Sequence, residues 1–362
     1  MEKIKIAVFL HGLSGGAGQV VIDYFSHMKY REDYEIDVIT LNIESDKLRR
    51  KYESAGMRVL LIPSKKESIL KNMLSMYHIF RRKKYDIAYG HMTLTNCFPF
   101  CIAKLCGIRT RISHSHLVVS PTIFNRILAK ATQLFSTDYL ACGIEAGKSL
   151  YGNHPFEVFN NAIDLQKFKY NSYIRCKIRK NNDITDDNFV IGHIGRFDRQ
   201  KNHDQLIDIF RVIMSENKDA KLILIGDGIL LSKIKEKVKN YGIEKDVIFT
   251  GAIDNVAEYI QAMDVFVLPS LYEGLCLSAI EAQCSGVPCV FSDTVSIETK
   301  KIENVSFVGL NDSSEKWASE ILSMENTMRE KKSIQILKNY GYDINIEAQR
   351  LDVYLRNSLT GK

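Results

Sequence analysis

The sequence predicts an α/β protein with two domains, each built around a doubly wound parallel sheet. The chain has 362 residues, which is about the length of two domains. Short apolar runs rich in β-branched residues alternate with segments long enough for a helix, as in parallel sheets with crossover helices. Residues 169–187 are polar and charged without an apolar period, and they are predicted to be a linker that leads into the second domain.

The first predicted sheet begins near the N-terminus. Its first strand, Lys3–Leu10, leads into a glycine-rich loop and then into a helix from about Gln19 to Met28. Further strands, with one short helix at the end, are expected at Ile36–Asn42, Arg58–Ile62, Asp86–Gly90, Thr110–Ser113, Tyr139–Cys142 and Glu145–Tyr151. The alternation of strands and helices predicts that this sheet is parallel.

The glycine-rich loop after the first strand has two interpretations. Its backbone N–H groups face a ligand diphosphate or an acceptor phosphate, or the loop is only a tight strand-to-helix turn. Gly16 and Gly18 match the first two glycines of the dinucleotide-binding pattern, but Val21 stands where the third is required. The sequence therefore disfavours an NAD-dependent dehydrogenase.

The second predicted domain opens with the strand Phe189–Ile194, a turn that contains Arg196 and Lys201, and an amphipathic helix. Two cations beside a helix N-terminus suit a diphosphate leaving group, because negative charge builds up on it as a glycosidic bond breaks. The alternative interpretation is that Arg196 and Lys201 are ordinary charged residues on the protein surface. Further strands and helices are expected in chain order at Lys221–Ile225, Lys245–Gly251, Asn255–Ala262, Val305–Val308, Ser314–Met324, Glu330–Tyr340 and Asp343–Leu359.

Residues 264–293, DVFVLPSLYEGLCLSAIEAQCSGVPCVFSD, predict a strand–loop–helix–strand unit at the edge of a parallel sheet. The helix runs from about Ser278 to Ser285. Ligands of such sheets bind where strands end, against helix N-termini whose free N–H groups favour phosphate. Glu273 lies in the loop, and Glu281 follows about two helical turns later. Both are either solvated surface residues or acceptors for sugar and ribose hydroxyls, and the second interpretation predicts a nucleotide sugar as ligand.

Together these motifs resemble the retaining GT-B glycosyltransferases of family 4. The E-x7-E element of that family is matched at Pro269, Glu273, Gly274, Leu277, Glu281, Ala282, Gly286, Pro288 and Val290. The G-R-F-x-x-x-K-N element is matched from Gly195 to Asn202, and Gly226-Asp227-Gly228 matches a third. Residues 158–168 resemble the element that joins the two domains, with Ala162 in place of the usual glycine.

The resemblance implies two Rossmann-like doubly wound domains that face a deep cleft. Residues 1–165, together with a C-terminal crossover helix at 343–359, are the expected acceptor-binding domain. Residues 166–342 are the expected donor domain for the nucleotide sugar. The transferred sugar would keep its anomeric configuration. No D-x-D sequence occurs in the chain, so we expect no metal on the donor diphosphate and no cofactor.

The resemblance also assigns residue roles. Arg196 and Lys201 would bind the donor diphosphate, Glu273 the sugar hydroxyls and Glu281 the ribose hydroxyls. A family histidine that contacts the donor sugar or the acceptor matches His114 or His116; both can face the cleft because alternate strand residues share a face, and we favour His116. The residues expected to act in catalysis are Glu273, His116, Arg196 and Lys201. Further donor contacts, several through backbone atoms, are expected at Gly15, Gly16, Gly226, Gly251, Ile253, Gly274, Leu275, Cys276 and Leu277.

Composition predicts a cytoplasmic protein. Apolar runs such as Cys97–Ile102 are far shorter than a membrane-spanning helix requires, and Ile6–Leu10 is shorter than the apolar core of a signal peptide. The eight cysteines include no C-x-x-C pair and lie mostly in apolar runs, as reduced buried thiols do. Cys97, Cys101 and Cys106 lack metal spacing and are expected on a helix.

The net charge of +6 is modest, and its basic residues gather in residues 65–84 between apolar ones. This segment is either a helix packed on the sheet with a solvated basic face, or a basic amphipathic surface for anionic lipid headgroups. The second interpretation adds peripheral attachment to the inner face of the cell membrane. Nucleic acid is disfavoured because no aromatic–basic module is present.

The function predicted from the sequence is transfer of a hexosyl or N-acetylhexosaminyl group from a nucleotide sugar, with UDP as the expected carrier, to a glycan acceptor. The overall likeness indicates capsule or exopolysaccharide synthesis on a lipid-diphosphate-linked acceptor. Two alternatives share the fold: a sugar-nucleotide epimerase, for which no cluster of acids and histidines was found, and a non-catalytic nucleotide-sugar-binding protein.

Overall fold

The structure is a computed structural model, and it describes residues 2–360. It contains two parallel sheets, one in each of two compact units. Unit 1 takes Met1–Ile163 and Gly341–Lys362, and unit 2 takes Asp164–Tyr340.

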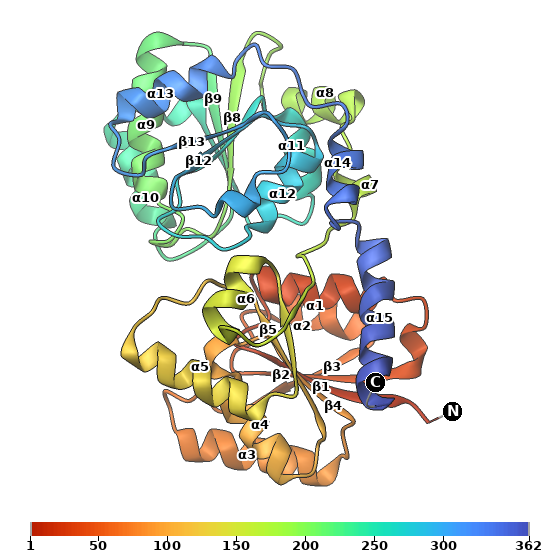
Figure 1. Cartoon of the computed structure of the whole chain (residues 1–362). Coiled ribbons are helices and arrows are strands. Elements are labelled where there is room, and N and C mark those ends of the chain that lie inside the picture. The colour runs from red at the N-terminus through yellow and green to blue at the C-terminus, as the bar shows by residue number, and fades with distance from the viewer. Residues whose placement is uncertain (1, 361–362) are drawn as a thin grey trace. The chain divides into compact units, whose positions relative to one another are not determined.

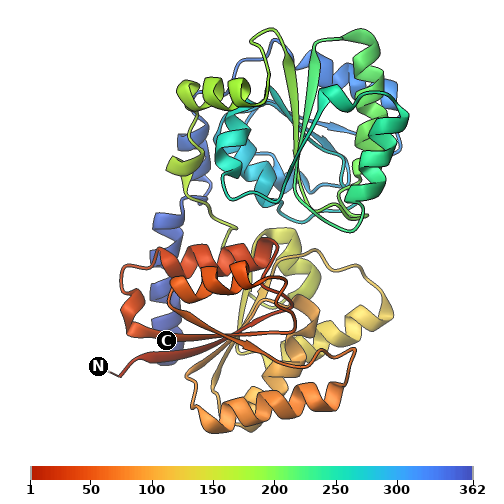
Figure 2. The ribbon, with the colours of Figure 1, turned by 180° about the vertical axis from the view of Figure 1, so that it is seen from behind.

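Unit 1 has seven strands, paired in the order β3-β2-β1-β4-β5-β6-β7 (Figure 1). The strands are β1 Ile4–Leu10, β2 Tyr34–Thr40, β3 Met57–Leu61, β4 Ile87–Gly90, β5 Thr110–Ser115, β6 Asp138–Ala141 and β7 Glu157–Val158. The helices are α1 Gly16–Ser26, α2 Asp46–Ser54, α3 Ile69–Arg82, α4 Cys97–Leu105, α5 Ile123–Phe135, α6 Ile144–Tyr151 and α15 Ile344–Thr360, with 3₁₀ turns at Arg31–Asp33 and Thr93–Asn96. The strand order reverses at β1, so this sheet is doubly wound as predicted. Helices α1 and α2 cover one face, and α3, α4 and α5 lie on the other (Figures 1 and 2).

The last helix, α15, packs against unit 1 beside α1. Asp352 accepts a hydrogen bond from the hydroxyl of Tyr34 at 2.5 Å, and Gln349 Nε2 donates to the backbone oxygen of His27 at 2.6 Å. The final segment of the chain therefore belongs to the same unit as the first.

Unit 2 has six strands, paired in the order β10-β9-β8-β11-β12-β13. The strands are β8 Phe189–Ile194, β9 Ala220–Ile225, β10 Val247–Gly251, β11 Val265–Leu268, β12 Cys289–Ser292 and β13 Val305–Val308. The helices are α7 Leu165–Phe168, α8 Ser172–Asn181, α9 His203–Glu216, α10 Leu231–Asn240, α11 Val256–Ala262, α12 Leu277–Cys284, α13 Ser314–Ser323 and α14 Ser333–Asn339, with 3₁₀ turns at Glu244–Asp246 and Ile297–Thr299.

The central strands are apolar on both faces because helices cover both sides of each sheet. In β11 every residue from Val265 to Leu268 is fully buried, and in β1 the same holds from Ile6 to Val8 and very nearly for Phe9 and Leu10. The expectation that residues 264–293 form the edge of a sheet is wrong. Strand β13 pairs with β12, so the strands of that segment lie inside the sheet.

The predicted linker at residues 169–187 is also wrong, because it contains α8. The Asn171 side chain caps this helix by accepting a hydrogen bond from the N–H of Ile174. Two of its inward positions are arginines: Arg175 Nη2 lies 2.6 Å from the Asp264 carboxylate, and the side chain of Arg179 is 2% exposed. Since these arginines share the inward face with Ile178, no clear apolar period marks the helix.

Two expectations from composition can be compared with the structure. Among the described residues, no helix has both the length and the apolar character that crossing a membrane requires. All eight cysteines are free thiols, and Cys97 and Cys101 lie on helix α4 as predicted, with Cys106 at its end.

Asp264 is predicted to be needed for the stability of unit 2. It accepts a hydrogen bond from the N–H of Val190 at 2.8 Å, besides its contacts with Arg175 and Arg179. Asp264→Ala leaves the buried Arg179 charge without a carboxylate, so we expect the free energy of unfolding to fall by about 3 kcal/mol. Denaturant titration followed by fluorescence of Trp317, the single tryptophan, which is buried in unit 2, measures this change.

The matched control is Asp219→Ala, because Asp219 is an exposed residue of the same unit. We expect its effect to stay within about 0.5 kcal/mol. Equal losses in the two variants would contradict a specific role for the Asp264 carboxylate.

Candidate functional site

In unit 2 the loops at the carboxyl ends of the strands are joined through their backbones. The N–H of Gly195 donates to the oxygen of Ile225 at 3.0 Å, which links the loops after β8 and β9. The N–H of Leu271 donates to the oxygen of Gln200 at 2.8 Å, which links the loop after β11 to the loop after β8. The predicted donor residues therefore lie on loops that hold one another in place.

Gly226 allows the backbones of the loops after β8 and β9 to lie very close to each other. Its φ is 142°, and a Cβ atom there would lie 2.0 Å from the backbone oxygen of Gly195. Its own N–H donates to the oxygen of Gly251 at 3.0 Å. Any side chain at this position would push the loops after β8 and β9 apart, which is the physical reason for a glycine here.

Lys201 and Glu273 form an ion pair at the centre of this loop cluster. Lys201 Nζ lies 2.6 Å from Glu273 Oε1, and the two side chains are 15% and 9% exposed. The Lys201 ammonium also approaches Cys276 Sγ at 3.4 Å, and the Ser270 hydroxyl donates to Glu273 Oε1 at 3.0 Å. Two residues expected to act in catalysis, seventy-two positions apart in the chain, are thus in direct contact.

This pairing keeps Lys201 charged and leaves hydrogen-bonding capacity for a ligand. Burial alone would lower the pKa of Lys201, but the adjoining Cys276 and Glu273 raise it above its usual value. An ammonium has three N–H donors, and two are directed at Glu273 and Cys276. The recorded contacts of Glu273 use Oε1, so Oε2 remains as an acceptor for a hydroxyl.

Arg196 and the start of α12 add positive potential. Arg196 is exposed, and no hydrogen bond or ion pair of its side chain is recorded among residues 2–360. Helix α12 begins at Leu277 with Cys276 as its N-cap. Within the same described range, the N–H groups of Leu277 and Ser278 have no recorded acceptor, as expected for the first turn of a helix. A helix N-terminus with free N–H groups favours an anion.

The remaining predicted donor residues of unit 2 lie on the same loops or on α12. Gly274 and Leu275 are half-buried between Glu273 and the start of α12. Ile253 is half-buried in the loop that follows β10. Glu281 is half-buried on α12, about one turn after its start. The donor roles of these residues stay predictions.

Two buried histidines beneath the loop after β8 were not singled out from the sequence. The His203 ring stacks on Phe197 with centroids 3.9 Å apart, and His193 Nδ1 lies 2.8 Å from the oxygen of Val267. Both ring nitrogens of His203 lack a hydrogen-bond partner in the part of the chain that the structure describes. Burial, with a further contribution from Lys201, lowers the pKa of His203 to about 3, so the ring is neutral near pH 7.

In unit 1 the glycine-rich loop joins β1 to α1. Gly15 has a φ of 89° and Gly16 is the first residue of α1, so a left-handed residue precedes the helix. Glu44 lies against this loop: it accepts hydrogen bonds from the N–H of Leu13 at 3.0 Å and from the hydroxyl of Ser14 at 2.8 Å. A carboxylate thus already occupies one backbone donor of the loop, which the sequence did not indicate. Whether Gly15 and Gly16 contact a donor stays a prediction.

The two predicted histidines of unit 1 belong to a cluster of three. Strand β5 runs two residues beyond its predicted end, and His114 and His116 lie on one face with ring centroids 4.2 Å apart. Gly90 pairs with Ser113 in the sheet, so His91, the first residue after β4, lies beside them. The three residues are 5%, 1% and 8% exposed in the order His91, His114 and His116.

Both ring nitrogens of His116 have partners, whereas its two neighbours each keep one ring nitrogen without a partner. His116 Nε2 lies 2.8 Å from His91 Nδ1, and His116 Nδ1 lies 3.3 Å from Asn161 Oδ1. His114 Nδ1 lies 2.9 Å from the hydroxyl of Tyr89. In the described part of the chain, Nε2 of His91 and Nε2 of His114 have no hydrogen-bond partner.

Burial keeps these imidazoles neutral. It lowers the pKa of His91 and of His114 well below the usual value, with a further contribution from the adjacent rings. Burial also lowers the pKa of His116 to about 4, although its hydrogen bond with Asn161 acts in the opposite direction. His91 could have been found from the sequence as a histidine directly after a predicted strand, but the pairing of β4 with β5 was needed to place it.

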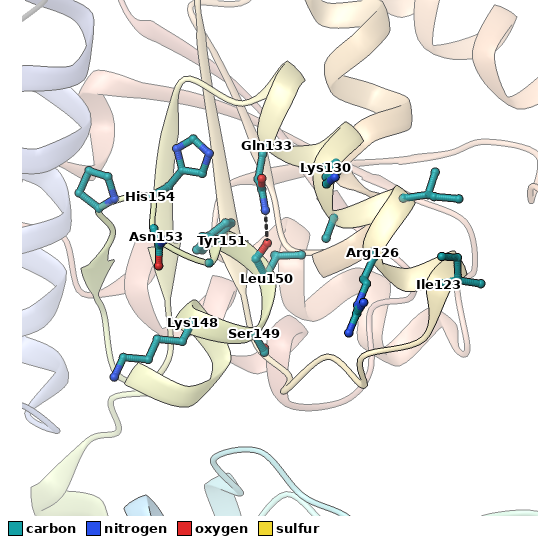
Figure 3. Close-up of a pocket in the computed structure, with 14 residues that line it drawn as sticks. Ile123, Arg126, Lys130, Gln133, Lys148, Ser149, Leu150, Tyr151, Asn153 and His154 are labelled. Carbon is teal, nitrogen blue, oxygen red and sulfur yellow. Dashed lines mark hydrogen bonds between the residues drawn. The ribbon is translucent and has the colours of Figure 1, made fainter.

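A separate pocket of about 680 Å³ lies between α5 and α6 of unit 1 (Figure 3). Gln133 Nε2 donates to the oxygen of Leu150 at 2.7 Å at its base. Apolar and cationic side chains line it, among them Ile123, Ile127, Pro155, Arg126, Lys130 and Lys148. None of the site residues predicted from the sequence lies in this pocket. Its α6 side belongs to the predicted helix Glu145–Tyr151, but no element was assigned to residues 117–135.

The comparisons with known proteins agree with the expected fold and family. The family model described as Glycosyl transferases group 1 matches residues 175–342. EpsF of Bacillus subtilis (strain 168), named as a glycosyltransferase, is 30% identical over 365 residues, which cover 92% of each chain. The UDP-Gal:alpha-D-GlcNAc-diphosphoundecaprenol alpha-1,3-galactosyltransferase of Escherichia coli is 27% identical over 313 residues, or 81% of this chain and 80% of its own.

The crystal structure of Anabaena Alr3699/HepE in complex with UDP-glucose has a TM-score of 0.80 and 20% sequence identity, and the match covers 98% of this chain and all of the other. At 20% sequence identity this similarity shows the fold alone. Two parallel α/β sheets in one chain thus confirm the predicted GT-B class.

His203 is predicted to make unit 2 sensitive to acid. The unfolded chain takes up a proton on this residue below about pH 6.5, whereas the folded pKa is about 3. Stability is therefore lost as the pH falls from about 6.5 towards 3. In His203→Leu, which removes no recorded hydrogen bond, we expect the loss between pH 6.5 and 5 to be smaller by about 1.4 kcal/mol per pH unit.

Denaturant titrations at pH 7 and pH 5, followed by Trp317 fluorescence, measure this difference. The control is His154→Leu, an exposed position of unit 1, which should leave the Trp317 transition unchanged. An acid loss in His203→Leu equal to that of the wild type would contradict the assignment.

Proposed function

Because the chain belongs to the group 1 glycosyl transferases, we propose that it moves a hexose or N-acetylhexosamine from UDP to a glycan acceptor with retention of the anomeric configuration. The observation that carries the proposal is the Lys201–Glu273 ion pair beside Arg196 and the start of α12. It combines cationic and N–H groups for a diphosphate with a carboxylate for sugar hydroxyls.

UDP is proposed as the carrier on the names of similar proteins. The Escherichia coli relative is named for UDP-Gal, and the Anabaena protein was solved with UDP-glucose. The same relative acts on a GlcNAc-diphosphoundecaprenol, which supports a lipid-diphosphate-linked acceptor and a place in capsule or exopolysaccharide synthesis.

In the proposed reaction the diphosphate binds between Arg196 and the first turn of α12. As the bond between the anomeric carbon and the diphosphate oxygen breaks, negative charge grows on the leaving group. Arg196, the remaining N–H of Lys201 and the free N–H groups of Leu277 and Ser278 stabilise that charge. These groups supply the positive potential directly, so we propose that the donor diphosphate needs no metal.

Glu273 orients the donor sugar in this scheme. Lys201 and Ser270 fix its Oε1, which leaves Oε2 to accept from a sugar hydroxyl. Glu281 accepts from the ribose hydroxyls. The acceptor hydroxyl attacks the anomeric carbon from the face that the diphosphate leaves, and the departing phosphate oxygen takes the hydroxyl proton.

Unit 1 supplies the acceptor side of the proposal. His114 and His116 lie at the carboxyl end of β5, the end of a parallel strand where ligands bind. The pocket between α5 and α6 offers three cationic side chains beside apolar ones (Figure 3). That chemistry suits an acceptor with an anionic group and an apolar portion.

The first test is release of nucleotide from a panel of UDP-, GDP- and dTDP-sugars, with and without EDTA. We expect slow hydrolysis of one UDP-sugar that survives EDTA. Arg196→Ala should lower the rate by about 100-fold or more, because it removes a charged donor to the developing anion. Glu281→Gln, which keeps the shape of the side chain, should weaken donor binding.

Arg196→Ala is chosen over a change at Lys201 because Arg196 is exposed and holds no recorded partner, so folding should be unaffected. The matched control is Arg199→Ala, an exposed arginine of the same loop, which should retain the wild-type rate. A lack of turnover and of donor binding by calorimetry across the panel would favour a non-catalytic protein.

We also propose that α3 contacts an anionic membrane surface. Its buried residues are Asn72, Met76 and Phe80. Its exposed side carries large apolar side chains and cations, namely Ile69, Leu70, Leu74, Tyr77, Lys71, Arg81 and Arg82, with Lys66 and Lys84 at its ends. Apolar and basic residues on one exposed face are what an interfacial helix presents to lipid headgroups.

Replacing Arg81, Arg82 and Lys84 by Glu is expected to reduce binding to vesicles that contain anionic lipid, since each cation near the surface contributes about 1 kcal/mol. Lys83 is left unchanged because it pairs with Glu35 and with the buried Asp37 at 2.8 and 2.9 Å. Vesicle co-sedimentation measures the effect.

The control replaces three exposed lysines of unit 2, Lys218, Lys239 and Lys331, by Glu. It makes the same change in net charge without altering α3. Vesicle binding that falls equally in both triple variants would show only a dependence on net charge and would contradict a role for α3.

A further inference from the structure

We propose that His91, His114 and His116 form a site for one transition-metal ion of the Zn²⁺ or Co²⁺ class. Each residue offers one ring nitrogen, and the three ligand atoms lie within 4.8 Å of one another. All three side chains are more than nine-tenths buried. Among residues 2–360 no other group of three His, Cys, Asp or Glu side chains meets the same geometry.

Outer contacts orient two of these rings as metal ligands. The Asn161 Oδ1 atom is an acceptor, so His116 donates its Nδ1–H to it and keeps a lone pair on Nε2. In the same way His114 can donate Nδ1–H to the Tyr89 hydroxyl oxygen at 2.9 Å. Its Nε2 atom, which has no hydrogen-bond partner among the described residues, then presents a lone pair to the metal ion. Histidine ligands in metalloproteins have such an oxygen acceptor on the second ring nitrogen.

His91 completes the set through Nδ1. This atom lies 2.8 Å from His116 Nε2, a distance at which the two nitrogens share one proton. With the proton on His91 Nε2 instead, both facing nitrogens present lone pairs. Tetrahedral zinc with bonds of about 2.0–2.1 Å to nitrogen would separate them by about half an ångström more, which small ring rotations allow.

The donor set predicts which ion binds. Three neutral imidazoles suit zinc and its neighbours in the first transition row, whereas Mg²⁺ and Ca²⁺ require oxygen ligands. Three histidines leave the fourth tetrahedral position open, as in catalytic zinc sites. The ligands are held by paired strands, since Gly90 of β4 is in register with Ser113 of β5.

The proposed metal site is independent of the proposed donor chemistry. The triad belongs to unit 1, and Arg196, Lys201 and Glu273 belong to unit 2. When an ion is bound, the contact of His116 with a sugar or acceptor hydroxyl would run through the open fourth position of the ion. Hydrolysis of the donor in EDTA and binding of metal are separate measurements.

The test is titration of chelator-treated full-length protein with Co²⁺, followed by the visible absorbance of tetrahedral cobalt. We expect one equivalent to bind, to be displaced by Zn²⁺, and to be unaffected by excess Mg²⁺. His91→Gln and His114→Gln should each weaken binding by about 100-fold or more. Tyr89→Phe, which keeps the ring but removes the outer contact to His114, should weaken it by about 10-fold.

The control His78→Gln, at an exposed position on α3, should bind cobalt as the wild type does. Circular dichroism checks that each variant is folded, and Tyr89→Phe, the smallest change, tests the site even if a histidine variant is not. Absence of tetrahedral cobalt in the wild type would overturn the proposal. So would an unchanged cobalt spectrum in His114→Gln, or an equal loss in His78→Gln.

Retained donor hydrolysis in a preparation that binds no cobalt would remove the metal site and leave the transferase proposal intact. Cobalt binding in a preparation that hydrolyses no donor would support the metal site and count against the transferase proposal.

Discussion

The arrangement of the proposed donor site depends on the ion pair between Lys201 and Glu273. Both side chains are largely shielded from water, so the loss of solvation of each charge is offset chiefly by the other, and removal of one would leave the second buried and uncompensated. The pair ties the loop after β8 to the loop after β11. It also has an electrostatic consequence: because Glu273 neutralises Lys201, the net positive potential for the proposed diphosphate would come from Arg196 and the start of α12. Lys201 contributes a directed N–H donor more than a free charge.

The short distances between loops impose a second constraint. A Cβ atom at Gly195 would lie 2.8 Å from Lys201 Cγ, and one at Gly226 would meet the backbone of Gly195. Side chains at these positions would displace the lysine and separate the loops. The glycines therefore act together with the ion pair to hold the loops close to one another. This brings backbone N–H groups close enough together for a small ligand to contact several loops at once.

Much of this fold could be predicted from local pattern. The strands Phe189–Ile194 and Val305–Val308 were predicted to the residue, because buried parallel strands are apolar without interruption. Helix α8 was missed because arginines occupy its inward face. The motif around Arg196 and Glu273 was visible in the sequence, but the contact of Lys201 with Glu273 depends on loops that tertiary structure brings together. His91 was missed for a similar reason, since only the register of β4 with β5 places it beside His114.

Both units contain buried polar groups of two kinds. Unit 2 pairs Lys201 with Glu273 and unit 1 pairs Lys83 with Asp37. Buried histidines of both units, among them His116 and His203, are kept uncharged by burial. The segment that supplies His91, His114 and His116 has no Asp or Glu between Asp86 and Asp138, so the segment itself contributes no carboxylate to offset an added cation. An ion held by three neutral rings would keep its full charge and would favour an anionic or ionised oxygen at its open position. With a metal ion bound, this uncharged histidine cluster would therefore favour negatively charged oxygen.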